Sequence, residues 1–168
     1  FTLLHDSERE AFEAQVAALG VGTTLLVDTY DTETGVDTAI EVTGPGLGAV
    51  RLDSGDLGEV AKATRAQLDA AGNTDTKITV TSDLDEYAIA SLAIAPVDSY
   101  GVGTSLVTGS GVPTVGFVYK LVSRADDDGQ MIAVAKKSKD KASVGGRKSA
   151  VRRLDDRHQL VEARVEQG

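Results

Sequence analysis

The chain has 168 residues, of which 41% are hydrophobic and 26% are charged, and its formal net charge is −9. This length and balance predict one soluble globular domain with a real core. The sequence contains no cysteine and no apolar run of about 18 residues, which excludes disulfides, thiolate metal sites and a membrane-spanning helix.

The charge is distributed unevenly along the chain. Residues 1–119 carry 18 acidic and 5 basic side chains, whereas residues 120–168 carry 8 and 12. An acidic protein is a poor candidate for general nucleic-acid binding. The basic tail could hold a phosphate-rich small molecule or an acidic partner surface, or it could simply be solvated. No signal peptide is visible at the start, and with the absence of cysteine this predicts a cytoplasmic protein.

Helix and strand signals alternate along most of the chain. A capping box predicts the first helix, with Ser7 as N-cap, Glu10 three residues later and Gly20 at the end. Ser82 is predicted to cap a later helix. In chain order, the predicted elements are a helix to residue 19, a strand at 23–27, a short helix around 36–40, a strand at 48–52, a helix at 57–71, a strand at 77–81, a helix at 85–95, and strands at 97–101 and 117–122.

This alternation, with strands roughly 20–30 residues apart, is typical of parallel βα units. The predicted strands are apolar runs, which indicates that both faces of the sheet are covered. The fold class is therefore α/β, as a barrel or a doubly wound sheet. The pattern ends near Arg124, where residues 126–129 predict a turn and 136–153 predict an extended basic loop with a short helix near its end.

A polar cluster follows each of the first four predicted strands. Because the carboxyl ends of parallel strands share one edge of a sheet, we expect these clusters to converge there. Taken singly, Asp28 or Asp31 is equally well a turn or cap residue, Ser82 is most simply a helix cap, and Asp83 is favoured at a helix N-terminus by the dipole. The clusters are Asp28-Thr29-Tyr30-Asp31, Arg51-Leu52-Asp53-Ser54-Gly55-Asp56, Thr81-Ser82-Asp83 and Ser99-Tyr100-Gly101-Val102-Gly103-Thr104.

Arg51 is the strongest single candidate for a binding residue. An arginine that closes a buried strand needs a carboxylate or phosphate partner, and Asp53 could be that partner within the protein. Gly101, Gly103 and Thr104 offer backbone N–H groups and a hydroxyl, which can cradle a phosphate or simply form a tight turn.

Three other residues carry weaker signals. Lys120 lies either along the core edge or toward the site. His5 and His158 belong to no spacing that is typical of a metal site or a catalytic triad, and no metal site is predicted.

Five segments of the chain form an ordered set of motifs, at residues 26–32, 50–57, 82–87, 100–104 and 118–122. Together they resemble the motifs of nicotinate phosphoribosyltransferase. The basic segment 137–153, with Gly145-Gly146-Arg147-Lys148, is similar to a late loop of the actinobacterial form of that family. The resemblance runs from Phe1 to about Arg153, and an ordered set of this kind is specific.

The resemblance implies a reaction of NAD salvage, in which nicotinate and phosphoribosyl pyrophosphate give nicotinate mononucleotide and pyrophosphate with coupled ATP hydrolysis. Nicotinate, phosphoribosyl pyrophosphate and ATP would be the partners, and Mg²⁺ would accompany phosphoribosyl pyrophosphate. The implied fold is the later part of a type II phosphoribosyltransferase α/β barrel. It would be an incomplete barrel over 1–123, followed by a basic loop and tail over 124–168. An N-terminal domain and early barrel strands would be missing, and the full-length protein would be a homodimer.

The same resemblance implies roles for individual residues. Arg51 would hold the nicotinate carboxylate and ring, and Asp53 would lie beside the base and ribose. Ser54 belongs to the same substrate-binding set. Further along the chain, the ribose hydroxyls would face Ser82 and Asp83, and the 5′-phosphate would be held by Gly101, Gly103 and Thr104. The additional candidates are Asp28, Tyr30 and Lys120.

No catalytic residue is predicted within the chain. The family couples ATP through a phosphorylated histidine in an Ala-His-Ser-Phe-like segment. Phe1 resembles the phenylalanine of that segment, so the histidine would fall just upstream, and His5 does not replace it. We therefore expect a fragment with little or no activity alone. Two alternatives stay open: a non-catalytic module that binds phosphate or nucleotide, and a phosphoribosyltransferase that uses nicotinamide or quinolinate.

Overall fold

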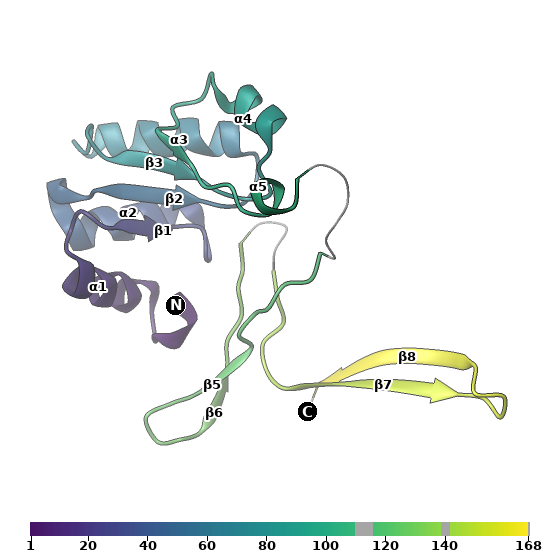
Figure 1. Cartoon of the computed structure of the whole chain (residues 1–168). Helices are drawn as coiled ribbons and strands as arrows, with labels where there is room; N and C mark the ends of the chain where they lie inside the picture. Colours follow the sequence, from purple (N-terminus) through teal and green to yellow (C-terminus); the bar gives the residue numbers. More distant parts are fainter. Residues whose placement is uncertain (110–115, 139–141, 168) are drawn as a thin grey trace. The chain divides into compact units, whose positions relative to one another are not determined.

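The chain is described from a computed structural model, which covers residues 1–109, 116–138 and 142–167 (Figure 1). It forms two compact units. Unit 1 consists of Phe1–Val118 with Lys137–Ala142, and unit 2 consists of Tyr119–Lys136 with Ser143–Gly168. The predicted division lay at residue 123, whereas the first segment of unit 1 ends at Val118. No helix in the described ranges is both long and apolar enough to cross a membrane.

Unit 1 is built on a four-stranded parallel sheet in the order β1-β2-β3-β4. The strands are β1 (Thr24–Leu26), β2 (Ala49–Leu52), β3 (Lys77–Val80) and β4 (Ser99–Tyr100). The helices are α1 (Glu8–Leu19), α2 (Thr32–Thr43), α3 (Leu57–Ala70), α4 (Glu86–Leu92) and α5 (Thr104–Thr108), with short 3-10 turns at Thr2–Leu4 and Gly44–Gly46. The predicted α/β class with parallel βα units is confirmed.

The first two helices begin at side-chain caps. The hydroxyl of Ser7 accepts the N–H of Glu10 at 3.1 Å, and Gly20 ends α1 with φ at 84°. Asp31 caps α2, because its Oδ1 accepts both the N–H and the hydroxyl of Thr34. This cap starts α2 at Thr32, earlier than the predicted helix around 36–40.

The predicted cap of the helix after β3 is wrong. Asp85, not Ser82, caps α4, and its Oδ1 accepts the N–H groups of Tyr87 at 3.1 Å and Ala88 at 2.8 Å. Ser82 lies in the preceding turn with φ at 139°, and its carbonyl accepts the N–H of Leu84. Both residue types favour N-caps, and the path of the turn decides between them.

The core of unit 1 lies on one face of the sheet. Leu25, Val50 and Ile78 are register partners on β1, β2 and β3, and each is fully buried. They pack with apolar side chains from α1, α2, α3 and α4 in one cluster, and Figure 1 shows α2 and α3 on the same side of the sheet.

The opposite face, here called the polar face, carries Arg51, Lys77, Thr79 and Ser99. Thr79 and Ser99 exchange a hydroxyl hydrogen bond there at 2.7 Å. Burial alternates along β1 and β3, whereas in β2 the polar-face residue Ala49 is buried beside Val50. The polar face is therefore mixed, and the prediction of apolar runs covered on both faces is wrong. The largest buried side chains of the strands are the alternate ones that meet the helices.

Asp98 fixes the start of β4. Its Oδ2 accepts the N–H of Ile78 at 2.9 Å, and its Oδ1 pairs with Lys77 Nζ at 3.0 Å. The side chain thus satisfies a backbone donor of β3 ahead of the ladder, which pairs only Thr79–Ser99 and Val80–Tyr100.

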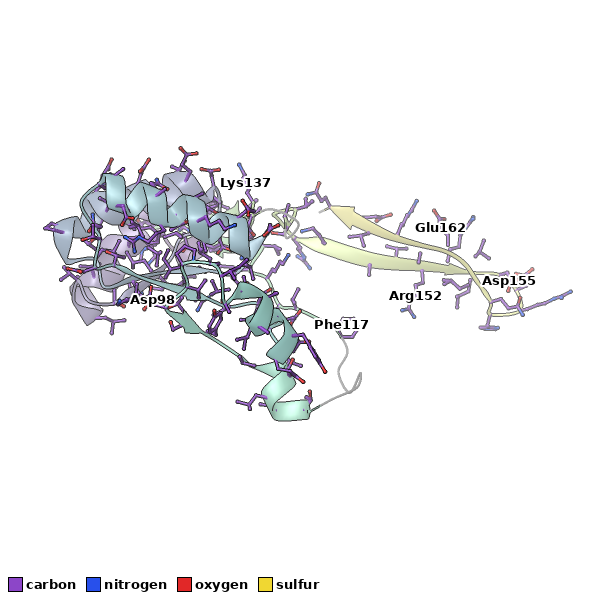
Figure 2. The ribbon with its side chains drawn as sticks, turned by 90° about the horizontal axis from the view of Figure 1, so that it is seen from above. Asp98, Phe117, Lys137, Arg152, Asp155 and Glu162 are labelled. Atoms are coloured by element: carbon purple, nitrogen blue, oxygen red, sulfur yellow. The ribbon has the colours of Figure 1, made fainter. Side chains whose placement is uncertain are left out.

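Unit 2 consists of two antiparallel hairpins. The first joins β5 (Ser123–Ala125) to β6 (Met131–Ala133), and the second joins β7 (Lys148–Leu154) to β8 (Leu160–Gln167). The predicted turn at 126–129 closes the first hairpin, where Asp126 Oδ1 accepts the N–H groups of Asp128 and Gln130. Figure 2 shows Arg152 and Glu162 on the second hairpin and Asp155 at its turn.

Two predictions about the C-terminal part are wrong. Residues 148–154 form a strand instead of a loop that ends in a short helix, because β8 pairs with them and Arg153 lies 3.4 Å from Glu162. Residues 117–122 form no strand, although their side chains favour one. Phe117 and Tyr119 are 89% and 96% exposed, and without a pairing strand in the described chain their propensity has no effect.

Candidate functional site

The carboxyl ends of β1, β2 and β3 bring three of the predicted polar clusters together. Asp28, after β1, accepts the N–H of Asp53 at 3.1 Å and the hydroxyl of Ser54 through its Oδ2. Asp53, after β2, accepts the hydroxyl of Thr81 through its Oδ1 at 2.6 Å. A chain of hydrogen bonds therefore runs along this edge of the sheet, which we call the rim.

Asp28 stabilises the rim through buried hydrogen bonds. Its side chain is only 1% exposed, and it holds both the backbone and the hydroxyl that follow β2. The second carboxylate oxygen, Oδ1, is also buried and has no hydrogen-bond partner among the described residues. Ser54 is 9% exposed and already donates to Asp28, so its hydroxyl is engaged within the protein.

Arg51 lies on the polar face just before the rim. Its register partners are Leu26 on β1 and Thr79 on β3. Asp53 follows two residues later, so both side chains project from the same face. The Nε of Arg51 is buried, and no acceptor for it exists in the described part of the chain. A buried guanidinium N–H without an acceptor favours an incoming carboxylate or phosphate.

The chain beyond β4 supplies the fourth cluster. Gly101 donates its N–H to Val80 at 2.9 Å, and a Cβ at this position would lie 2.5 Å from the Thr81 methyl. Gly103 precedes α5, and no side chain caps that helix within the described ranges. The N–H groups of the first turn that make no backbone bond, beginning at Thr104, are therefore open to water or to a ligand.

The other predicted residues lie in different surroundings. Ser82 and Asp83 follow Thr81 in the turn before α4, where Asp83 is exposed and Ser82 holds φ at 139°. Non-glycine residues adopt such a φ only under strain. Lys120 belongs to unit 2, whereas the rim belongs to unit 1.

Glu8, at the start of α1, is a rim-associated group that the sequence reasoning missed. Burial is the main cause that raises its pKa to about 7, and the charges of Asp28 and Asp31 contribute to that shift. Burial also raises the pKa of Tyr30, to which the charge of Glu8 contributes. The sequence shows Glu8 only as a favourable acid in a first helical turn, because its contact with the end of β1 is tertiary.

A cavity of about 320 Å³ lies beside the rim within unit 1. Lys137 lines this cavity, and its backbone N–H donates to the carbonyl of Thr29 at 3.2 Å. The residues that line the cavity are Tyr30, Asp31, Thr32, Glu33, Ser54, Gly55, Val60 and Lys137. Among the described residues, no three acidic or histidine side chains gather closely enough to hold a metal ion.

Known proteins with similar sequences are nicotinate phosphoribosyltransferases. The pncB1 enzyme of Mycobacterium tuberculosis is 57% identical over 161 residues, which cover 91% of this chain and 35% of that protein. The enzyme of Bacillus subtilis is 44% identical over 137 residues, which cover 76% and 28%. The predicted resemblance is confirmed, and the chain spans about a third of the length of the curated relatives it matches. No protein-family model matches the chain.

Two solved structures share the fold. Nicotinate-nucleotide pyrophosphorylase from Pyrococcus furiosus aligns with a TM-score of 0.55 and 23% identity, over 96% of this chain and 39% of that one. Nicotinate phosphoribosyltransferase from Porphyromonas gingivalis aligns with a TM-score of 0.61 and 17% identity, over 83% and 43%. At these identities the likeness establishes the α/β fold and nothing about the substrate.

Proposed function

We propose that this chain supplies part of the substrate-binding rim of a nicotinate phosphoribosyltransferase, the activity for which its curated relatives are named. In the reaction the pyridine nitrogen of nicotinate bonds to C1′ of phosphoribosyl pyrophosphate, and pyrophosphate leaves. The chain contributes groups that orient the two substrates, and we assign no proton transfer to its residues.

The observation that carries this proposal is the buried Nε of Arg51, which lacks an acceptor among the described residues. A planar guanidinium on the polar face can donate two parallel N–H bonds to a carboxylate. Nicotinate carries a carboxylate on a flat ring, which suits this fork. Nicotinamide has no negative charge there, so Arg51 would favour nicotinate over nicotinamide.

Asp53 is the acid next to Arg51 on the polar face, and Thr81 holds it at 2.6 Å. A carboxylate at this place can accept the hydroxyls of a ribose. Ser54 instead has a structural part in the site, because its hydroxyl donates to Asp28 and links the ends of β1 and β2. In this proposal Ser82 and Asp83 lie beside the same ribose, in the turn that follows Thr81.

The 5′-phosphate is assigned to the start of α5. Gly103 and Thr104 offer N–H groups and a hydroxyl at a helix terminus that no side chain caps in the described chain. Gly101 has a steric reason to be glycine, since the Thr81 methyl fills the space beside it. We therefore place the phosphate contact at Gly103 and Thr104, with Gly101 leaving room for the Thr81 methyl.

The same proposal includes Mg²⁺, ATP and a homodimer of the full-length protein. Because no three potential metal ligands gather among the described residues, the substrate phosphates would supply most of the Mg²⁺ ligands. Such a metal would offset charge on the pyrophosphate group. Coupling to ATP belongs to the full-length protein, and no residue described here is assigned to it.

The test compares three pyridines in the full-length protein that contains this chain. Nicotinate, nicotinamide and quinolinate are each supplied with phosphoribosyl pyrophosphate, and mononucleotide formation is measured. We expect nicotinate to be preferred, and Arg51→Met to raise its KM roughly 30- to 100-fold through loss of a charge-assisted pair. Equal use of nicotinamide, unchanged by Arg51→Met, would contradict the assignment of Arg51.

A further inference from the structure

Thr81 is tied to the end of β2 by two hydrogen bonds. Its backbone N–H donates to the carbonyl of Leu52 at 2.8 Å, and its hydroxyl donates to Asp53 Oδ1 at 2.6 Å. The backbone bond continues the ladder between β2 and β3 past the last paired residues. The hydroxyl bond links the Asp53 carboxylate to the residue that follows the neighbouring strand, β3.

The missing side chain of Gly101 leaves room for the Thr81 methyl. A Cβ built on Gly101 would lie 2.5 Å from the Thr81 methyl and 3.6 Å from its Cβ, and the φ of Gly101 lies outside the region that needs glycine. The glycine is therefore required by this close approach to Thr81. A threonine side chain has few χ1 rotamers, so a fixed methyl also fixes the hydroxyl.

We propose that Thr81 and Gly101 form a positioning pair for Asp53. Gly101 leaves room for the Thr81 methyl, and the resulting rotamer directs the Thr81 hydroxyl to Asp53 and holds that carboxylate in one orientation at the rim. Thr81 touches no substrate in this arrangement and acts through Asp53. The inference rests on the proposed function, in which Asp53 lies beside the base and ribose.

Two substitutions of Thr81 separate the hydroxyl from the methyl. In the full-length protein, Thr81→Val keeps the shape and removes the donor, whereas Thr81→Ser keeps the donor and removes the methyl. We expect Thr81→Val to lower kcat/KM roughly tenfold to a hundredfold, the usual effect of losing a hydrogen bond to a charged group. Thr81→Ser should retain kcat/KM within a few-fold. Equal activity of Thr81→Val and the unchanged protein would overturn the proposal.

Gly101→Ala provides a second and independent readout. The added methyl forces the Thr81 side chain out of its rotamer, so Gly101→Ala alone should resemble Thr81→Val. In the Thr81→Ser background the clashing methyl is gone, and the nearest remaining neighbour lies at an ordinary 3.6 Å. Gly101→Ala should then be tolerated, which makes the two substitutions strongly non-additive. Equal losses in both backgrounds would show that the pair is not coupled.

The unchanged protein, the two single variants Gly101→Ala and Thr81→Ser, and the double variant form a double-mutant cycle. Each protein is measured by thermal unfolding as well as by kcat/KM. If the full-length protein forms no nicotinate mononucleotide, the proposed function fails, and the unfolding midpoints still report whether Thr81 and Gly101 are coupled. If the protein is active and Thr81→Val lowers only the unfolding midpoint, the residue is purely structural and the positioning role is refuted.

Discussion

Gly48 stands directly before β2, where the chain passes very close to Gly22. A Cβ on Gly48 would lie 2.2 Å from the Gly22 carbonyl oxygen, 2.5 Å from its carbon and 2.7 Å from its Cα. The Gly48 backbone is held on both sides, since its N–H donates to Val21 and its carbonyl accepts from Lys77. The obstacle is backbone, so a rotamer change cannot relieve it.

Gly48→Ala is therefore expected to destabilise the fold. Ordinary contact begins at 3.4 Å, so the two segments must separate by about 1 Å. Overpacking of this kind costs about 1–3 kcal/mol, and the lower chain entropy of unfolded alanine returns about 0.5–1 kcal/mol. We expect a net loss of about 1 kcal/mol, which corresponds to a fall in Tm of about 2–4 °C for a chain of this size.

The assay is denaturant unfolding followed by circular dichroism, with Gly22→Ala as the matched control. Gly22 is the other member of the contact, has no positive φ, and meets nothing within 4 Å of an added Cβ. Its substitution should be neutral or slightly stabilising. If Gly48→Ala and Gly22→Ala unfold at the same denaturant concentration, the close-approach argument is refuted.

Three further predictions concern the ends of the helices and the turn before α4. The pKa of Glu8 is raised to about 7 from 4.5, so the folded protein keeps this proton to a higher pH than the unfolded chain, and stability falls as pH rises between these values. Above pH 7, Glu8→Gln should then raise the free energy of unfolding by about 1 kcal/mol, which is only a fraction of the full shift because the carboxyl is half-exposed. At pH 4 the substitution should leave the free energy of unfolding almost unchanged. A gain of the same size at both pH values would contradict this. Ser82→Gly should raise the free energy of unfolding by about 1 kcal/mol, since release of strain exceeds the entropy cost of glycine, whereas Asp83→Gly in the same turn should lower it. In chemical denaturation, Asp85→Ala should lower the free energy of unfolding by about 1 kcal/mol, and Asp85→Asn should lower it much less. A larger loss from Ser82→Ala than from Asp85→Ala would show that Ser82 is the cap of α4.

Local signals account for the parts of the fold that the sequence predicts well. Ser7 and Gly20 place the ends of α1, because capping depends on a few neighbouring residues. The convergence of Asp28, Asp53 and Thr81 at the rim follows from parallel strands alone, whatever the details of packing.

The remaining features depend on contacts between distant residues. Ser82 and Asp85 are both good cap residues, and the choice between them depends on the path of the turn after β3. The strand at 148–154 forms only because β8 pairs with it, and the predicted strand at 117–122 is absent because no described strand pairs with it. The pKa of Glu8 and the contact of Gly101 with Thr81 likewise arise only once the chain is folded.

The order of the sheet also has a consequence for handling this polypeptide. β1 and β4 are the outermost strands, and no described strand pairs with the outer side of either. Each therefore presents backbone donors and acceptors that a second molecule can satisfy. The short length of both strands limits this pairing between molecules without preventing it. Preparations of the isolated chain should therefore self-associate more as protein concentration rises, and they should keep best when dilute.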